Sequence, residues 1–133
     1  MCPALSDAVN RLMDSVFRYA DMRHAHAIHL CMQYIETHYY EKVTLEQLAQ
    51  RVFLSPAYLS RVFKEETGTA FNDYLNAVRI AKARQLLLHE DLRVTDVASA
   101  VGFDDQSYFT KVFRRVTGMT PLRYRTRYTQ GEE

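Results

Sequence analysis

The chain contains two copies of one segment, at residues 44–68 and 94–118. Ala49 and Val52 of the first copy match Ala98 and Val101 of the second. After a one-residue insertion in the second copy, the matched pairs are Tyr58 with Tyr108, Val62 with Val112, Phe63 with Phe113, Thr67 with Thr117 and Gly68 with Gly118. Most of these residues are apolar, as core residues are, or are glycines that can end helices. The repeat therefore predicts two similar packed units.

Residues 70–88, between the two copies, favour one long helix. They contain no Gly or Pro and are rich in Ala, Leu, Arg, Lys and Gln. At about 1.5 Å per residue the helix would be roughly 28 Å long. A helix wetted on one side shows a single apolar stripe, whereas here the apolar faces differ at the two ends. They are Phe71, Tyr74, Leu75 and Val78 early in the segment, and Ile80, Ala83, Leu86 and Leu87 later. The helix is therefore predicted to join two packed units.

Capping signals divide each copy into a short helix, a tight turn and a longer helix, which is the helix-turn-helix outline. Side chains of Ser, Thr and Asp satisfy the free N–H groups at a helix start, and Gly allows the left-handed conformation at a helix end. The candidates are Thr44 with Gln47 as a capping box, Ser55 before Pro56, Asp104 or Asp105, and the terminating Gly68 and Gly118.

Four glycines and three prolines in 133 residues make long loops improbable, and 47% hydrophobic residues suffice for a core. We therefore predict an all-α fold in which two helix-turn-helix subdomains are joined by a long central helix. The expected helices cover residues 27–39, 45–52, 56–67, 70–88, 95–101, 106–117 and 121–128. In the last helix Leu122, Tyr124 and Tyr128 are available for packing.

Residues 1–27 have no counterpart in the repeat. Leu5, Val9, Leu12 and Val16 recur at helical spacing among polar residues, which predicts an amphipathic helix. This helix either packs on the rest of the chain or is the end of a truncated sensing or dimerising region. The predicted organisation is residues 1–27 as this helix and a linker, 28–128 as a double helix-turn-helix domain, and 129–133 as a tail.

His24, His26 and His29 lie close together in sequence and invite a metal interpretation. A structural zinc site needs four ligands, and neither a CxxC nor an HExxH motif accompanies these histidines. We therefore favour a solvated junction, in which His26 and His29 can share a helix face, and expect no metal and no cofactor. The other Asp, Glu and His residues are scattered, and no Ser or Cys has a partner motif, so an enzyme is not expected.

Positive charge is concentrated near the C-terminus, although the net charge is only +1. Residues 106–130 contain no Asp or Glu but six basic residues, namely Lys111, Arg114, Arg115, Arg123, Arg125 and Arg127. Such a face suits a polyanion, and the alternative is an ordinary solvated helix face.

The remaining composition bears on location. Two isolated cysteines, Cys2 and Cys31, do not form a disulfide framework and point to a reducing cytoplasm. No apolar run approaches the roughly 18–20 residues of a membrane span, and no secretory leader opens the chain. We therefore expect a cytoplasmic protein without a membrane partner.

Both longer helices of the repeat separate apolar from polar residues. In the first, Leu59, Val62 and Phe63 are predicted to face inward, and in the second Phe109, Val112 and Phe113. The outward sets are rich in groups that donate to base edges or phosphates. They are Ala57, Ser60, Arg61 and Lys64 in the first helix and Gln106, Ser107, Thr110, Lys111 and Arg114 in the second.

These motifs resemble the DNA-binding domain of AraC/XylS-type bacterial transcription regulators over residues 28–128. The similar segments are SPAYLSRVFKEETG, FNDYLNAVRIAKARQLL and VTDVASAVGFDDQSYFTKVFRRVTGMTPLRYR. The resemblance implies a sequence-specific regulator whose two recognition helices enter successive major-groove segments on one side of double-stranded DNA. By position, Ala57, Ser60, Arg61 and Lys64 would face the first segment, and Gln106, Ser107, Thr110 and Lys111 the second. Relatives often carry larger residues where this chain has Ala57 and Ser60.

Arg61 and Lys111 are our candidates for base specificity, and Lys64, Arg114, Arg115 and Arg123 for phosphate contacts. Ser55 and Tyr58 complete the predicted DNA-binding set at the start of the first recognition helix. Tyr58 and Tyr108 either donate to phosphates or have buried rings. Two readers on one face of B-DNA must lie roughly 34 Å apart, a separation that a helix of about 28 Å and its flanking turns can supply.

Two other aspects of function stay open at this stage. An all-helical protein-interaction or signalling module would use similar packing but would not need exposed helix faces poor in acid. If the chain is a regulator, RNA polymerase is a further expected partner, and an effector ligand would be bound by a region outside this chain.

Overall fold

The computed structural model describes residues 22, 24–89 and 91–129, and the described part is helical with no strand. A first helix covers residues 24–38. It is followed by α2 (Leu45–Val52), α3 (Pro56–Thr67), α4 (Phe71–Leu87), α5 (Val94–Ala100), α6 (Gln106–Thr117) and α7 (Pro121–Thr129). The all-α prediction is confirmed. The helix expected within residues 1–20 lies outside the described residues.

The predicted capping residues start the helices as expected. Thr44 and Gln47 form a complete capping box on α2, and the hydroxyl of Ser55 accepts from the Tyr58 N–H at the start of α3. Of the two aspartates proposed for α6, Asp105 is the cap and accepts from two backbone N–H groups. Gly68 ends α3 in a left-handed conformation. Gly118 ends α6 in the same way.

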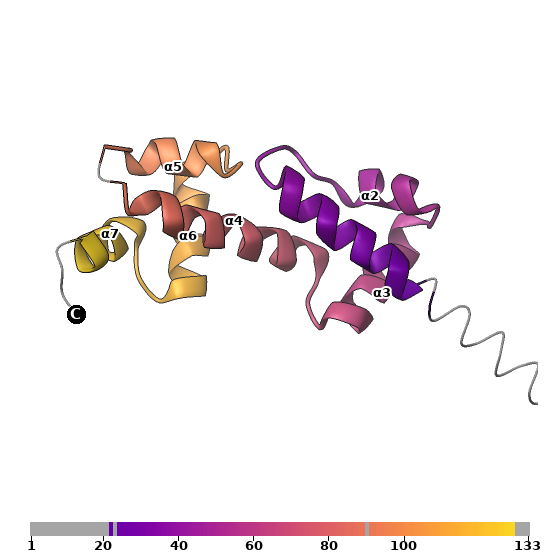
Figure 1. Cartoon of the computed structure of the whole chain (residues 1–133). Coiled ribbons are helices and arrows are strands. Elements are labelled where there is room, and N and C mark those ends of the chain that lie inside the picture. The colour runs from indigo at the N-terminus through magenta and orange to yellow at the C-terminus, as the bar shows by residue number, and fades with distance from the viewer. Residues whose placement is uncertain (1–21, 23, 90, 130–133) are drawn as a thin grey trace, which may run out of the picture.

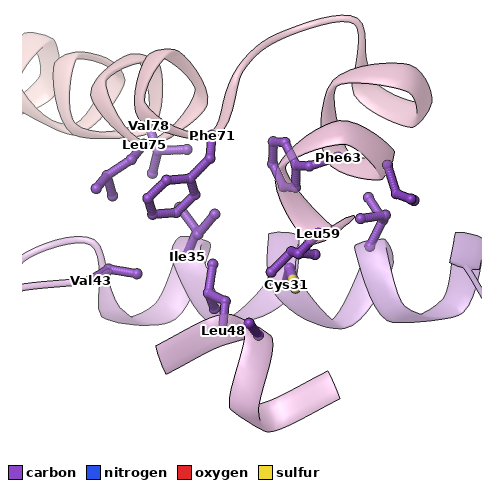
Figure 2. Packing of buried hydrophobic residues seen from close by; sticks show 12 residues of the cluster. Cys31, Ile35, Val43, Leu48, Leu59, Phe63, Phe71, Leu75 and Val78 are labelled. Atoms are coloured by element: carbon purple, nitrogen blue, oxygen red, sulfur yellow. The ribbon is translucent and has the colours of Figure 1, made fainter. Parts of the chain in front are cut away.

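Two hydrophobic cores lie at opposite ends of α4, which confirms that this helix joins two packed units. The first core contains Phe71, Leu75 and Val78 of α4, packed against the first helix, α2 and α3 (Figure 2). The second core contains Ile80, Ala83 and Leu87 of α4, packed against α5, α6 and α7. We call the two units the N-terminal and C-terminal subdomains. Since α4 has 17 residues, it is about 25 Å long.

The repeat extends further than the sequence comparison indicated. Tyr74, on the helix that follows α3, has its ring centroid 5.5 Å from that of Phe63, with an interplanar angle of 78°. Tyr124, on the helix that follows α6, lies 5.5 Å from Phe113 at 80°. The start of α4 is therefore the counterpart of α7. In the view of Figure 1, α5 lies above α4 and α6 runs downward behind it, whereas α2 and α3 lie beyond the right-hand end of α4.

Two sequence predictions need correction. The first helix already includes residue 24, N-terminal to the predicted start at residue 27, so His24 and His26 lie on this helix and not in a linker, whereas His29 lies within the helix that was predicted. Leu122 is 64% exposed and does not pack, because α7 turns Tyr124 toward the second core instead. Tyr128 is half exposed, with its ring centroid 4.5 Å from that of Tyr124.

Within the described part of the chain, no helix is both long and apolar enough to span a membrane.

Candidate nucleic-acid interface

The first candidate recognition helix, α3, is anchored by one buried face. Leu59, Val62 and Phe63 are at most 3% exposed and belong to the first core. Because residues three and four apart share a helix face, burying these three leaves the opposite face to solvent. The side chains on that face and at its start are exposed, except for half-buried Tyr58: Ser55, Ala57, Ser60, Arg61 and Lys64.

The second candidate helix, α6, repeats this arrangement with more positive charge. Phe109, Val112 and Phe113 are at most 1% exposed. The predicted outward residues of α6 are exposed, apart from half-buried Thr110: Gln106, Ser107, Lys111, Arg114 and Arg115. Arg123 is exposed on the first turn of α7, the helix that directly follows. The structure thus brings the predicted residues onto two solvent-facing surfaces, one in each subdomain.

The two surfaces differ in how their basic groups are held. Arg61 lies over the ring of Tyr58 at 5.1 Å and is 3.7 Å from the carboxylate of Glu65, one turn away. This is the single ion pair found within residues 22, 24–89 and 91–129. Both of its side chains are about two-thirds exposed, so the pair is weak in water. The cations of α6 have no acidic residue on their own helix, so the field there is more positive.

Two tyrosines tie the candidate helices to the rest of the fold, which the sequence did not predict. The hydroxyl of Tyr58 on α3 is 2.8 Å from Nε2 of His24 on the first helix. The hydroxyl of Tyr108 on α6 accepts a hydrogen bond from Nδ2 of Asn76 on α4, at 3.2 Å. In each subdomain the tyrosine therefore contacts the helix that precedes the helix-turn-helix motif. The available signal was Asn76, the one polar side chain among the buried residues of α4.

A cleft of about 750 Å³ lies elsewhere on the N-terminal subdomain. It is lined by the first helix, by Leu48, Arg51 and Val52 of α2, and by Tyr74 of α4. None of the predicted DNA-binding residues lines it, so the two exposed helix faces are separate from this cleft. Within the part of the chain that the structure describes, no three His, Cys, Asp or Glu residues are grouped to hold a metal ion.

The order of the helices, the repeated packing and the two polar helix faces define a double helix-turn-helix domain. A family model described as a helix-turn-helix domain matches residues 48–127. The regulatory protein PocR of Salmonella typhimurium is 42% identical over 94 residues, which are 71% of this chain and 31% of that protein. This chain belongs to the AraC-type family of helix-turn-helix regulators, as its motifs indicated.

Solved structures agree with this assignment. The C-terminal domain of AraT, a response regulator from Geobacillus stearothermophilus, has a TM-score of 0.74 and 36% identity, covering 80% of this chain and 88% of that one. The DNA-binding domain of AdpA, in complex with a target DNA, has a TM-score of 0.69 and 28% identity, covering 82% and 95% respectively. The chain spans about a third of the length of the curated relatives it matches.

Proposed function

We propose that this chain binds double-stranded DNA as the DNA-reading part of a transcription regulator, with α3 and α6 entering two successive segments of the major groove. The observation that carries the proposal is the repeated exposed polar face of α3 and α6, each fixed to one end of α4 by a buried apolar face. The likeness to a domain solved with its target DNA supports it. The major groove of B-DNA is wide enough to admit an α-helix.

Individual roles follow from position and chemistry. Arg61 and Lys111 lie on the exposed faces and reach base edges, where a good hydrogen-bonded pair discriminates by about 1–3 kcal/mol. Ala57, Ser60, Gln106, Ser107 and Thr110 line the same faces and contribute smaller contacts. The remaining exposed groups hold the phosphate backbone, which sets affinity and its dependence on salt: Ser55, Tyr58, Lys64, Arg114, Arg115 and Arg123.

The geometry of α4 supports reading one site with one chain. A length of about 25 Å, together with the turns at both ends, suits two readers separated by one helical turn of DNA, roughly 34 Å. Because the two readers differ in sequence and are fused, the site needs no two-fold symmetry. The unit responsible comprises residues 28–128.

The wider setting of the protein is part of the same proposal. The chain spans about a third of the length of the relatives it matches. An effector ligand is therefore bound by a region outside this chain. RNA polymerase is the further partner of a transcription regulator. A bacterial cytoplasm is the compartment in which such a protein meets its DNA, and the free thiol of Cys31 is compatible with that compartment.

Footprinting on the DNA upstream of the chain's own coding region tests this proposal. We expect protection of two neighbouring major-groove segments on one side of the duplex, together roughly 20 base pairs. Arg61→Ala and Lys111→Ala should each relax base preference within one segment only. Uniform weakening on every sequence would instead make the substituted residue a phosphate contact. No saturable binding at low salt would favour the alternative, an all-helical protein-interaction module.

A further inference from the structure

The two subdomains meet where the loop after the first helix lies beside the turn that follows α5 (Figure 1). Gly102 in that turn has a φ of +100°, and a Cβ on it would be 2.8 Å from the carbonyl oxygen of Tyr39. This approach is too close for any residue with a Cβ, so glycine is required here. The ring of Tyr39 packs against both hydrophobic cores. The loop of one subdomain is therefore in direct contact with the turn of the other.

Arg79 of α4 lies at this contact. Its Nε donates to the carbonyl oxygen of Tyr39 at 2.7 Å, and its Nη2 donates to that of Glu41 at 2.9 Å. Its guanidinium lies 5.4 Å from the ring centroid of Phe103, on the side of the C-terminal subdomain. In sequence it stands between Val78 of the first core and Ile80 of the second. One side chain thus contacts both subdomains at the middle of α4.

The chemistry of these contacts favours a fixed arrangement. Hydrogen bonds from a charged donor are stronger than those between neutral groups, and two N–H groups of one planar guanidinium fix direction as well as distance. Burial lowers the pKa of Arg79, and the nearby carboxylate of Asp104 opposes this. The guanidinium stays charged at physiological pH.

We propose that Arg79 is a positioning residue that sets the orientation of the two helix-turn-helix subdomains relative to each other. The inference rests on the proposed function, because orientation matters only if both readers engage one DNA. The length of α4 fixes the separation of the subdomains along its axis. Rotation and bending of one subdomain relative to the other are limited by contacts that lie off the axis of α4. The contact of Arg79 with residues 39–41 and with Gly102–Phe103 is such a contact.

The chain contains a matched control for this role. Arg125 of α7 donates from Nε to the carbonyl oxygen of Leu87 at 2.8 Å and from Nη2 to that of His89 at 3.2 Å. The bonds are the same in kind as those of Arg79, but they lie within the C-terminal subdomain. Arg125→Ala therefore removes an equal charge and equal bonds without touching the contact between subdomains.

A distance measurement without DNA tests the proposal directly. Spin labels on Glu66→Cys and Val116→Cys, both exposed near the C-terminal ends of α3 and α6, report the separation of the two subdomains in a Cys2→Ser background. We expect one narrow distance distribution in the parent and in Arg125→Ala, and a broad one in Arg79→Ala. A distribution in Arg79→Ala as narrow as that of the parent would overturn the proposal.

Two further variants cover a failure of Arg79→Ala to fold. Arg79→Lys keeps the charge but loses the planar guanidinium with its two directed N–H groups. Gly102→Ala keeps Arg79 in the sequence but places a Cβ 2.8 Å from the Tyr39 carbonyl oxygen and 3.1 Å from the Arg79 guanidinium, so it disturbs the same contact from the other side. Both should broaden or shift the distance distribution while the circular dichroism spectrum remains helical. An unchanged distribution in either folded variant contradicts the inference.

DNA binding separates this inference from the proposed function. Each protein is titrated with a two-segment site and with two sites in which one segment is scrambled. Linking two readers raises affinity only if both can engage at once, so Arg79→Ala should reduce affinity for the full site about tenfold or more. Its affinity for either single segment should change less than twofold, and the full-to-single ratio should be kept in Arg125→Ala. If the parent binds the full site no more tightly than a site with one intact segment, the proposed two-segment reading fails. If the parent binds the full site more tightly and Arg79→Ala keeps that difference in affinity, only the role of Arg79 fails.

Discussion

Phe53 occupies a backbone conformation that is unfavourable for its side chain. It follows α2 with a φ of 60°, in the left-handed region, and its ring is 90% exposed. The corresponding turn of the C-terminal subdomain carries Gly102, for which a positive φ costs little. The two copies of the repeat therefore make the same turn with residues of very different intrinsic preference.

Replacing Phe53 with Gly should stabilise the protein. A left-handed conformation costs an L-residue about 1–2 kcal/mol, which the substitution removes. Glycine also gives the unfolded chain more conformational freedom, and this offsets part of the gain in stability. We expect the free energy of unfolding, measured by urea denaturation, to rise by about 1 kcal/mol. The matched substitution Gly102→Ala should lower the free energy of unfolding. Alanine is strained at a φ of +100°, and its Cβ would lie 2.8 Å from the Tyr39 carbonyl oxygen. Equal or lower stability of Phe53→Gly would mean that the exposed ring makes a contact that offsets the strain.

The helices of this domain are capped unequally, and the N-cap side chains of α4 and α5 accept no hydrogen bond. α2, α3 and α6 have side-chain caps from Thr44, Ser55 and Asp105, whereas Ala70 before α4 has none. Its φ of −67° and ψ of 154° already suit an N-cap residue. The helix that joins the two cores thus depends on tertiary packing at its first turn.

The substitution Ala70→Ser should strengthen that turn. A serine hydroxyl at this position can accept from a free N–H group of the first turn, which adds about 1 kcal/mol to helix stability. Since Ala70 is exposed, no core contact is disturbed. We expect a higher urea midpoint with an unchanged slope. Ala70→Val, which offers no acceptor, is the control, and an equal gain from it would rule out capping as the cause.

The two subdomains share α4, so we expect the folding stability of the whole domain to depend on both hydrophobic cores, and a change in one core should be measurable in the unfolding of the whole domain. Cys31 lies in the first core with 1% exposure, and burial raises the pKa of its thiol from 9.0 to about 11. In the unfolded chain the thiol ionises at its ordinary pKa, while in the folded chain it keeps its proton. Between these two pKa values the folded state binds more protons, so stability must fall as the pH rises.

This linkage gives a prediction for alkaline solution. Between pH 8 and pH 10 the free energy of unfolding should decrease by about 1 kcal/mol more in the natural chain than in Cys31→Ala, which lacks the titrating group. Urea titrations at a series of pH values measure this difference. Identical pH dependence in the two proteins would show that the thiol is as accessible folded as unfolded.

The sequence by itself determined the helices, their caps and the two-sided character of α4. Capping depends on residues within one turn of each other, as with Thr44 and Gln47, and apolar periodicity identifies which faces are buried. It also identified the exposed residues of α3 and α6, because burying Leu59, Phe63 and their counterparts leaves only the opposite face. These are local relations, so they can be read along the chain.

Only the tertiary structure decided which distant groups meet. Arg79 and Tyr39 are 40 residues apart, and Asn76 and Tyr108 are 32 apart, so no local pattern pairs them. The need for Gly102 likewise arises from a carbonyl oxygen in another subdomain. Such pairings depend on how two packed units are oriented in space, and sequence periodicity carries no information about that orientation.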